Sequence, residues 1–300
     1  MKKWLWILSA YLLVANAARP ASDFLDGRGM SGRLAQQLGR LIQKKAVVPL
    51  TTLAEQAGKS FQLAVPLAPP PEAEWTPEEI YSACSDSVVL VGRAHKCPRC
   101  SRWHSAVATG FPVGRDDLFV TAHHVVTNDG NGQALGIMTR DGRLFPVKAI
   151  AAADPENDLV IVQTEPTGLR PLPVAEEVRI GAPVFAIHHT APNLFAFTQG
   201  TVVGKFMIKE KDNAPTPVLA VSTDFAPGSS GGPILDRHGA VAGIISSINP
   251  ITAACTKGTN SPIQMIWKYG IPSSKLLELT KNKPAEPLRT KSKPSSRTAD

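Results

Sequence analysis

The chain has 300 residues, of which 43% are hydrophobic and 19% charged, with a formal net charge of +7. These values are typical of a globular protein with room for one large domain or two small ones. Much of the basic excess lies at the two ends of the chain, and the last twenty residues contain no aromatic side chain. A role in nucleic-acid binding is therefore disfavoured.

The first 17 residues have the three parts of a secretory signal peptide. Lys2 and Lys3 precede an apolar run from Trp4 to Val14, and Ala15-Asn16-Ala17 has the small-residue pattern of a cleavage site. The apolar run is well short of the roughly 20 residues that a membrane-spanning helix needs, and no later segment is long and apolar enough to span. We therefore expect cleavage after Ala17 and export to the periplasm or the cell exterior.

Residues 18–75 are expected to form a partly helical N-terminal extension. Apolar side chains recur at helical spacing, at Leu34, Leu38, Leu41 and Ile42. Such a helix, basic on its other faces, can lie on a membrane surface or, as we expect, dock on the following domain. The extension could also be a pro-segment that keeps an enzyme latent until it is cut. It ends in a proline-rich linker, and the segment from Thr76 to Glu79 then has the pattern of a helix start.

Residues 76–281 are predicted to form one all-β domain. Short runs rich in β-branched residues alternate with Asp-Gly and similar turns, and no helical pattern separates them until a short helix near residue 275. The expected strands lie near residues 87–92, 105–113, 118–126, 144–153, 159–164, 183–189, 198–204, 217–223, 232–236 and 240–246. Residues 282–300, basic and rich in proline and serine, are expected to form a disordered tail.

The four cysteines allow three interpretations. In an exported protein an even number favours disulfides, and we expect Cys97–Cys100 and Cys84–Cys255. Alternatively, His95, Cys97, Cys100 and His104 could bind zinc, although the histidines lie closer to the cysteines than in the usual finger spacing. A thioredoxin-like redox site is less well supported, since no βαβ pattern surrounds the motif.

A glycine-rich segment from Pro227 to Pro233 contains the candidate nucleophile, Ser230. By itself such a segment can be an ordinary turn. Upstream, however, a pair of histidines, His123 and His124, ends an apolar strand, and Asp158 directly precedes another. A serine hydroxyl needs a neighbouring base, and the base needs an orienting acid. The order His, Asp, Ser is that of the chymotrypsin arrangement.

These motifs together resemble the trypsin-like serine proteases of the chymotrypsin fold, and most closely the catalytic domain of bacterial HtrA-type proteases. The matching segments are Thr121–Val126, Asp154–Leu159 and Pro227–Pro233, within a likeness that spans roughly residues 80–280. The resemblance implies two six-stranded antiparallel β-barrels and a serine endopeptidase that acts on proteins or peptides without a cofactor. It selects His124 as the base, Asp158 as the acid and Ser230 as the nucleophile, with Gly228 and Ser230 as oxyanion donors.

The substrate-binding residues are less well defined by the sequence. Asp224 has the spacing from Ser230 of the specificity acid in trypsin, but it could equally stabilise a turn. Substrate backbone is expected to pair along the segment formed by Ser246, Ser247 and Ile248. Unlike most HtrA-type proteases, this sequence shows no PDZ domain after the protease region. The alternative function is a weakly active or latent peptide-binding protein on the same scaffold, and the oligomeric state is left open.

Overall fold

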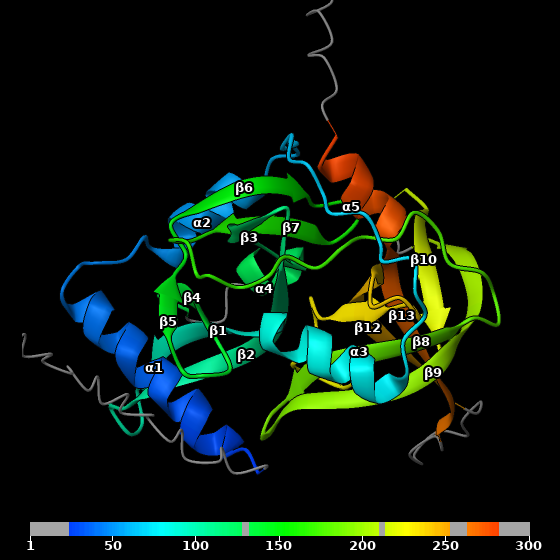
Figure 1. Ribbon diagram of the computed structural model, residues 1–300. Helices are drawn as coiled ribbons and strands as arrows, with labels where there is room; N and C mark the ends of the chain where they lie inside the picture. Colours follow the sequence, from blue (N-terminus) through cyan, green and yellow to red (C-terminus); the bar gives the residue numbers. More distant parts are fainter. Residues whose placement is uncertain (1–23, 128–131, 210–213, 253–262, 282–300) are drawn as a thin grey trace, which may run out of the picture.

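The computed structural model describes residues 24–127, 132–209, 214–252 and 263–281, which form two β-sheets side by side with helices at their margins (Figure 1). The expected signal peptide, the basic tail and Cys255 lie outside the described residues. The helices are α1 (Gly27–Gln43), α2 (Leu50–Ala57), α3 (Pro77–Cys84), the 3-10 turn η1 (Ser85–Ser87), α4 (His123–Thr127) and α5 (Ser273–Leu279). The strands are β1 (Val89–Lys96), β2 (Trp103–Val113), β3 (Arg115–Ala122), β4 (Ala134–Met138), β5 (Leu144–Pro146), β6 (Ala149–Asp154), β7 (Leu159–Gln163), β8 (Pro183–Thr190), β9 (Asn193–Ile208), β10 (Thr216–Val221), β11 (Pro233–Leu235), β12 (Val241–Thr252) and β13 (Ile263–Pro272).

The first sheet contains seven strands in the order β5-β4-β1-β2-β3-β7-β6 and curls toward closure. Between β5 and β6, the Val147 N–H donates to the Leu135 carbonyl at 3.0 Å, while the next N–H, of Lys148, donates to the Gln163 carbonyl at 2.8 Å. Two successive residues thus link the opposite margins of the sheet. Its interior is filled by fully buried side chains such as Phe119.

The second sheet is a closed six-stranded barrel in the order β10-β13-β12-β11-β8-β9. The expected all-β, chymotrypsin-like architecture is confirmed, with the difference that the first sheet has seven strands and closes less completely. Two strands, β4 and β13, were not foreseen from the sequence. The first half of β13 is exposed although it contains Ile263, Met265 and Ile266, and its pairing with β12 defines it as a strand.

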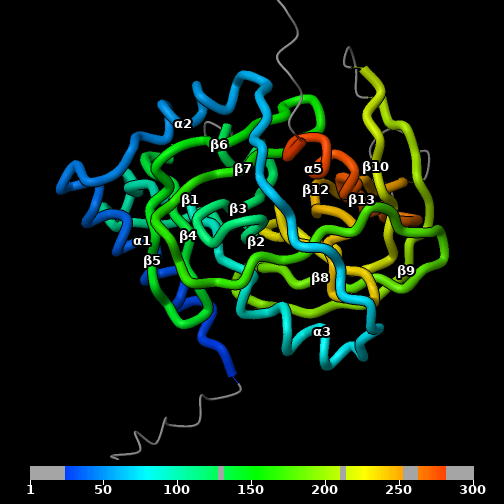
Figure 2. Tube along the Cα trace, turned by 45° about the horizontal axis from the view of Figure 1, so that its top comes forward, coloured from blue at the N-terminus to red at the C-terminus, as the bar shows by residue number. Residues whose placement is uncertain are grey.

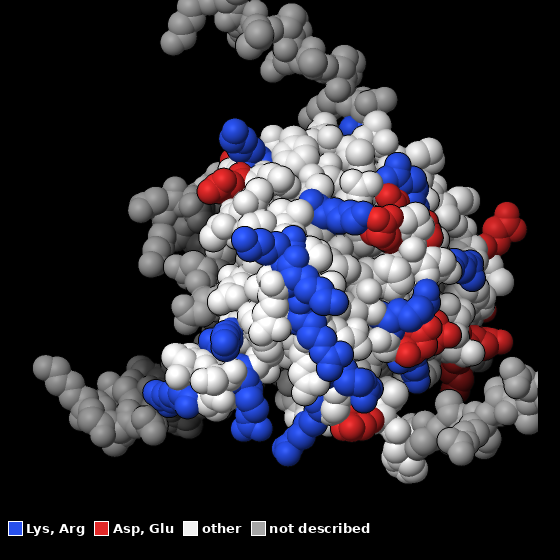
Figure 3. Space-filling model, turned by 90° about the vertical axis from the view of Figure 1, so that its left-hand side faces the viewer, with Lys and Arg blue, Asp and Glu red and all other residues white. Residues whose placement is uncertain are grey.

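Helix α1 docks on the first sheet through the predicted apolar positions. Leu34 and Leu38 are fully buried and pack against Leu90 and Met138 of β1 and β4. The membrane-surface interpretation of this helix is therefore disfavoured, because its apolar face is already covered by protein. Its exposed side is basic, and Figure 3 shows Lys and Arg side chains gathered on this side of the molecule. Within the described residues, no helix combines the length and apolarity that crossing a bilayer requires.

The segment between α2 and α3 crosses from one sheet to the other (Figure 2). Its Leu63 N–H donates to the Leu279 carbonyl at the end of α5 at 3.0 Å, and its Trp75 N–H donates to the Arg237 carbonyl at 2.8 Å. The helix start predicted at Thr76 is confirmed, since the Thr76 and Glu79 side chains each accept a hydrogen bond from the other's backbone N–H. The proline-rich linker is thus fixed at both ends.

Candidate active site

The candidate base and acid are brought together by two neighbouring strands. β3 ends at Ala122, which pairs with Leu159 at the start of β7. The chain turns into α4 directly after Ala122, so that His124 faces Asp158 from the first turn of the helix. The His123 N–H donates to the Asp158 carbonyl at 2.9 Å, and Asp158 has a φ of 54°, an uncommon conformation for a non-glycine residue. Backbone pairing therefore fixes both residues.

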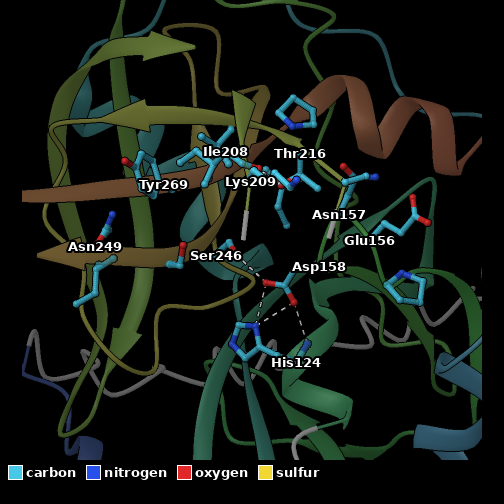
Figure 4. A pocket seen from close by; sticks show the side chains of 18 residues that line it. His124, Glu156, Asn157, Asp158, Ile208, Lys209, Thr216, Ser246, Asn249 and Tyr269 are labelled. Carbon is cyan, nitrogen blue, oxygen red and sulfur yellow. Dashed lines mark hydrogen bonds and ion pairs between the residues drawn. The ribbon is translucent and has the colours of Figure 1, made fainter. Parts of the chain in front are cut away.

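The carboxylate of Asp158 accepts three kinds of hydrogen bond (Figure 4). His124 approaches with Nδ1 at 3.0 Å and 2.9 Å from the two carboxylate oxygens and donates its backbone N–H at 2.9 Å. The Ser246 hydroxyl donates to the second oxygen at 2.7 Å. Burial alone would raise the pKa of Asp158, but the hydrogen bonds and charge of His124, with that of Ser246, hold the pKa below its ordinary value. Asp158 is therefore a carboxylate at neutral pH.

The candidate nucleophile lies on the loop before β11. Gly228 and Gly231 flank Ser230 with φ values of +102° and +84°, which only glycine adopts readily. Among the described residues, the hydrogen bond of the Ser230 hydroxyl goes to the Ser246 carbonyl at 3.4 Å and not to His124. Ser246 thus contacts both Ser230 and Asp158. Catalytic hydrogen bonds are often absent or long without substrate, and a side-chain rotation would be needed to form the one between Ser230 and His124.

Two backbone donors on this loop are unused within the described structure. The N–H groups of Ser229, Gly231 and Gly232 donate to carbonyls, at 3.0, 2.7 and 2.9 Å. The N–H groups of Gly228 and Ser230, which were predicted as oxyanion donors, make no such bond in the part of the chain that the structure describes. They are available to bind an oxygen that carries negative charge.

A buried polar network behind the loop was missed by the sequence analysis. Ser229 is fully buried, and its hydroxyl lies 2.9 Å from Nδ1 of His188 and accepts the Ala226 N–H at 3.2 Å. On the other side of the ring, His188 Nε2 lies 3.0 Å from the Asp224 carbonyl. The Thr109 hydroxyl donates to the Gly228 carbonyl at 2.9 Å. The only sequence feature that could have indicated this network is the adjacent pair His188 and His189 in the otherwise apolar strand β8.

The second histidine of that pair, His189, is expected to make the free energy of unfolding decrease at acidic pH. It is fully buried, and burial lowers its pKa to about 3. In the unfolded chain this histidine binds a proton near pH 6.5, whereas in the folded chain it does not. The stabilising contribution of neutral His189 is therefore complete above pH 6.5 and is lost as the pH falls toward 3. We expect about 2 kcal/mol less unfolding free energy at pH 5 than at pH 7 from this group.

Denaturant unfolding of the His189→Asn variant at the two pH values measures this contribution. Asparagine can keep an acceptor for the Phe195 N–H, which donates to His189 Nδ1 at 3.0 Å, and it does not titrate. The decrease in unfolding free energy between pH 7 and pH 5 should be smaller in the variant by about 2 kcal/mol. Equal losses in both proteins would show that His189 does not carry the effect.

A cleft of about 640 Å³ opens beside His124 and Asp158. Its other wall includes the predicted substrate-binding residues Ser246, Ser247 and Ile248, together with parts of β10 and β13. Ser230 is not among the lining residues that the structure describes. Asp224, the candidate specificity acid, has a side chain that is 86% exposed and forms an ion pair with Lys268 of β13. A basic substrate side chain would have to displace that lysine.

The described cysteines carry no disulfide. Cys97 and Cys100 are free thiols at the end of the β1–β2 hairpin, and a hydrogen bond with His104 lowers the pKa of Cys100 to about 6. Cys84 is buried, its thiol donates to the Gly239 carbonyl at 3.7 Å, and burial raises its pKa to about 11. The predicted Cys97–Cys100 disulfide is therefore not formed in the structure, and the predicted Cys84–Cys255 pair involves a residue outside the described part.

Comparison with known proteins supports the expected resemblance. Residues 108–244 match the trypsin-like peptidase domain, a segment that contains all three candidate catalytic residues. The solved structure of the HtrA-type protease AlgWS227A with tripeptide aligns with a TM-score of 0.53 over 68% of this chain and 62% of its own, at 19% sequence identity. The chain is thus similar to trypsin-like protease domains of the HtrA type. The expected resemblance and the expected fold are confirmed.

Curated proteins similar to this chain include proteases from several organisms. A probable periplasmic serine endoprotease, DegP-like, of Chlamydia muridarum is 30% identical over 50% of this chain and 30% of its own length. The putative serine protease HhoA of Synechocystis is 27% identical over 69% of this chain and 54% of its own. An uncharacterised Sinorhizobium fredii protein, y4bJ, is 29% identical over 48% and 22%. The chain thus spans about half, or less, of the length of these relatives.

Proposed function

We propose that this chain is an exported serine endopeptidase with His124, Asp158 and Ser230 as its catalytic triad. The observation that carries the proposal is the Asp158 carboxylate, which lies within 3.0 Å of His124 Nδ1 and is linked through Ser246 to Ser230. An imidazole bound in this way has Nε2 free to accept a proton, which is the state a general base needs.

In the proposed mechanism, His124 takes the proton of the Ser230 hydroxyl as the serine oxygen attacks the peptide carbonyl. Asp158 stabilises the imidazolium without taking its proton. The oxyanion of the tetrahedral intermediate binds the free N–H groups of Gly228 and Ser230, each worth about 10²–10³-fold in rate. His124 then protonates the leaving amine, and water hydrolyses the acyl-enzyme by the reverse sequence of proton transfers.

The substrate is proposed to bind as an added strand on the free side of β12. β11 is short and pairs with β12 only at residues 241–244, and Ile245 is engaged by the loop residues Gly231 and Gly232. From Ser246 onward that side of β12 borders the cleft and pairs with no described strand. An extended peptide there would donate and accept backbone hydrogen bonds, so recognition would depend little on its side chains.

Export rests on the signal-peptide pattern of residues 1–17, and the periplasmic designation of a DegP-like relative supports it. An extracytoplasmic compartment for the reaction follows from this, and the similarity to serine proteases supports protein or peptide substrates. The latent peptide-binding alternative has one observation in its favour, the bond of the Ser230 hydroxyl to the Ser246 carbonyl in place of His124.

Fluorophosphonate labelling of the purified chain, with the adduct located by mass spectrometry, tests the proposal. An activated serine reacts, whereas an ordinary hydroxyl does not, because only the former has a base beside it. Labelling confined to Ser230, together with cleavage of an unfolded protein substrate, is expected. A folded protein that neither labels nor cleaves would instead support the latent peptide-binding function.

A further inference from the structure

The turn that joins β1 to β2, residues 97–102, brings two cysteines and a histidine together at a distance from the cleft. Cys97 and Arg102 close the turn, since the Cys97 N–H donates to the Arg102 carbonyl at 2.9 Å. The Ser101 N–H donates to the Cys97 carbonyl at 3.0 Å, and Ser101 has a positive φ of 55°. This tight backbone places Cys97, Cys100 and His104 on one side of the hairpin end.

The three side chains form a compact ligand set. Their sulfur and nitrogen atoms all lie within 4.8 Å of one another, and Cys100 Sγ is 3.1 Å from His104 Nε2. In a tetrahedral zinc site with Zn–S near 2.3 Å and Zn–N near 2.0–2.1 Å, ligand atoms lie about 3.5–3.8 Å apart. The set therefore needs only small side-chain shifts to surround an ion.

We propose that Cys97, Cys100 and His104 bind a zinc ion. Two thiolates and an imidazole are ligands that select zinc over magnesium or calcium, which prefer oxygen. His95, which pairs with His104 across the two strands, stacks on its ring at 5.9 Å between centroids and is outside the ligand set. The fourth position is accordingly left to water, and His95 acts by orienting the His104 ring.

Such an ion would hold the hairpin end against α1. Trp103, the residue before His104, lies so close to Gly39 of α1 that a Cβ at that position would come within 2.4 Å of the indole ring. A fixed turn thus keeps this contact in place, and zinc should stabilise the whole N-terminal sheet. The site lies apart from His124, Asp158 and Ser230, so the inference does not depend on the proposed catalytic function.

The test uses the full purified chain, reduced, treated with a chelator and titrated anaerobically with Co²⁺ and then Zn²⁺. We expect about one Co²⁺ per chain with the thiolate-to-cobalt absorption and the visible bands of a tetrahedral site, all displaced by Zn²⁺. Cys97→Ser, Cys100→Ser and His104→Ala should each lower the affinity by more than about 100-fold, since loss of an outer-shell partner alone costs 10–100-fold.

Cys255→Ser is the matched control, because it removes a cysteine that is not in the ligand set, and it should bind Co²⁺ as the parent chain does. Zn²⁺ should also raise the thermal midpoint of the parent chain but not that of Cys100→Ser. The inference is overturned if the reduced parent chain gives no tetrahedral spectrum, or if the Cys97→Ser and Cys100→Ser variants give the same spectrum and affinity as the parent. Both readouts are independent of protease activity.

Discussion

Replacement of Ser230 by alanine is expected to lower kcat for peptide hydrolysis on the order of 10⁶-fold, the scale found when the nucleophile of a serine protease is removed. The hydroxyl supplies the bond to the acyl intermediate, and the hydroxyl of the adjacent Ser229 is buried and bonded to His188. Hydrolysis of an unfolded protein substrate, followed by gel or by fluorescence, measures the loss. Circular dichroism should show an unchanged fold, because the variant removes a single weak hydrogen bond.

The adjacent serine provides the matched control. Ser229 is buried and bonded to His188, so Ser229→Ala should cost about 1–3 kcal/mol of stability by leaving the Ala226 N–H and the imidazole without their partner. The folded fraction of this variant should still label with fluorophosphonate at Ser230. Labelling that survives in Ser230→Ala but disappears in Ser229→Ala would show that Ser229, and not Ser230, is the nucleophile.

Asp158→Asn is expected to lower kcat by about 10⁴-fold while the substrate still binds. The carboxylate now accepts from His124 Nδ1, and an amide in its place would no longer hold the imidazole in the tautomer that leaves Nε2 free. Steady-state kinetics at saturating substrate measure the effect, with KM expected to change little. The variant also weakens the link to Ser246, whose hydroxyl bonds the same carboxylate.

Asp154→Asn, four residues upstream in the same motif, is the control for charge and position. The Asp154 side chain accepts from the Asn157 backbone N–H at 3.2 Å and from its amide at 2.7 Å, and so stabilises the turn that precedes Asp158. We expect a change in kcat of less than about 10-fold, because the group does not touch His124. Equal losses in both variants would mean that the turn, and not the Asp158 carboxylate, governs the rate.

Local sequence patterns predicted the parts of this protein whose structure depends on near neighbours. The capping box of Thr76 and Glu79 is satisfied within four residues, so its pattern could be read without the fold. The apolar spacing of Leu34 and Leu38 likewise gave both the helix and its buried face. The short helix expected near residue 275 is α5, which begins at Ser273 with Pro272 at its N-cap position.

Contacts between distant segments could not be predicted in this way. The Ser246 hydroxyl reaches Asp158 across 88 positions of sequence, and the His188–Ser229 pair spans 41. Neither serine has a local pattern that distinguishes a partner of the catalytic groups from a surface residue. Only the closed second barrel and the pairing of β3 with β7 bring these groups within hydrogen-bond distance.

The sequence by itself predicted the family resemblance, the all-β class and the candidate triad, since each motif is a short run of residues whose chemistry is local. The tertiary structure decided which groups support that triad, that Lys268 pairs with Asp224, and that Cys97, Cys100 and His104 gather around one point. The physical reason is that hydrogen bonds, ion pairs and metal ligands act over a few ångströms of space. Distance along the chain does not limit these interactions, so they form only when the two sheets have folded.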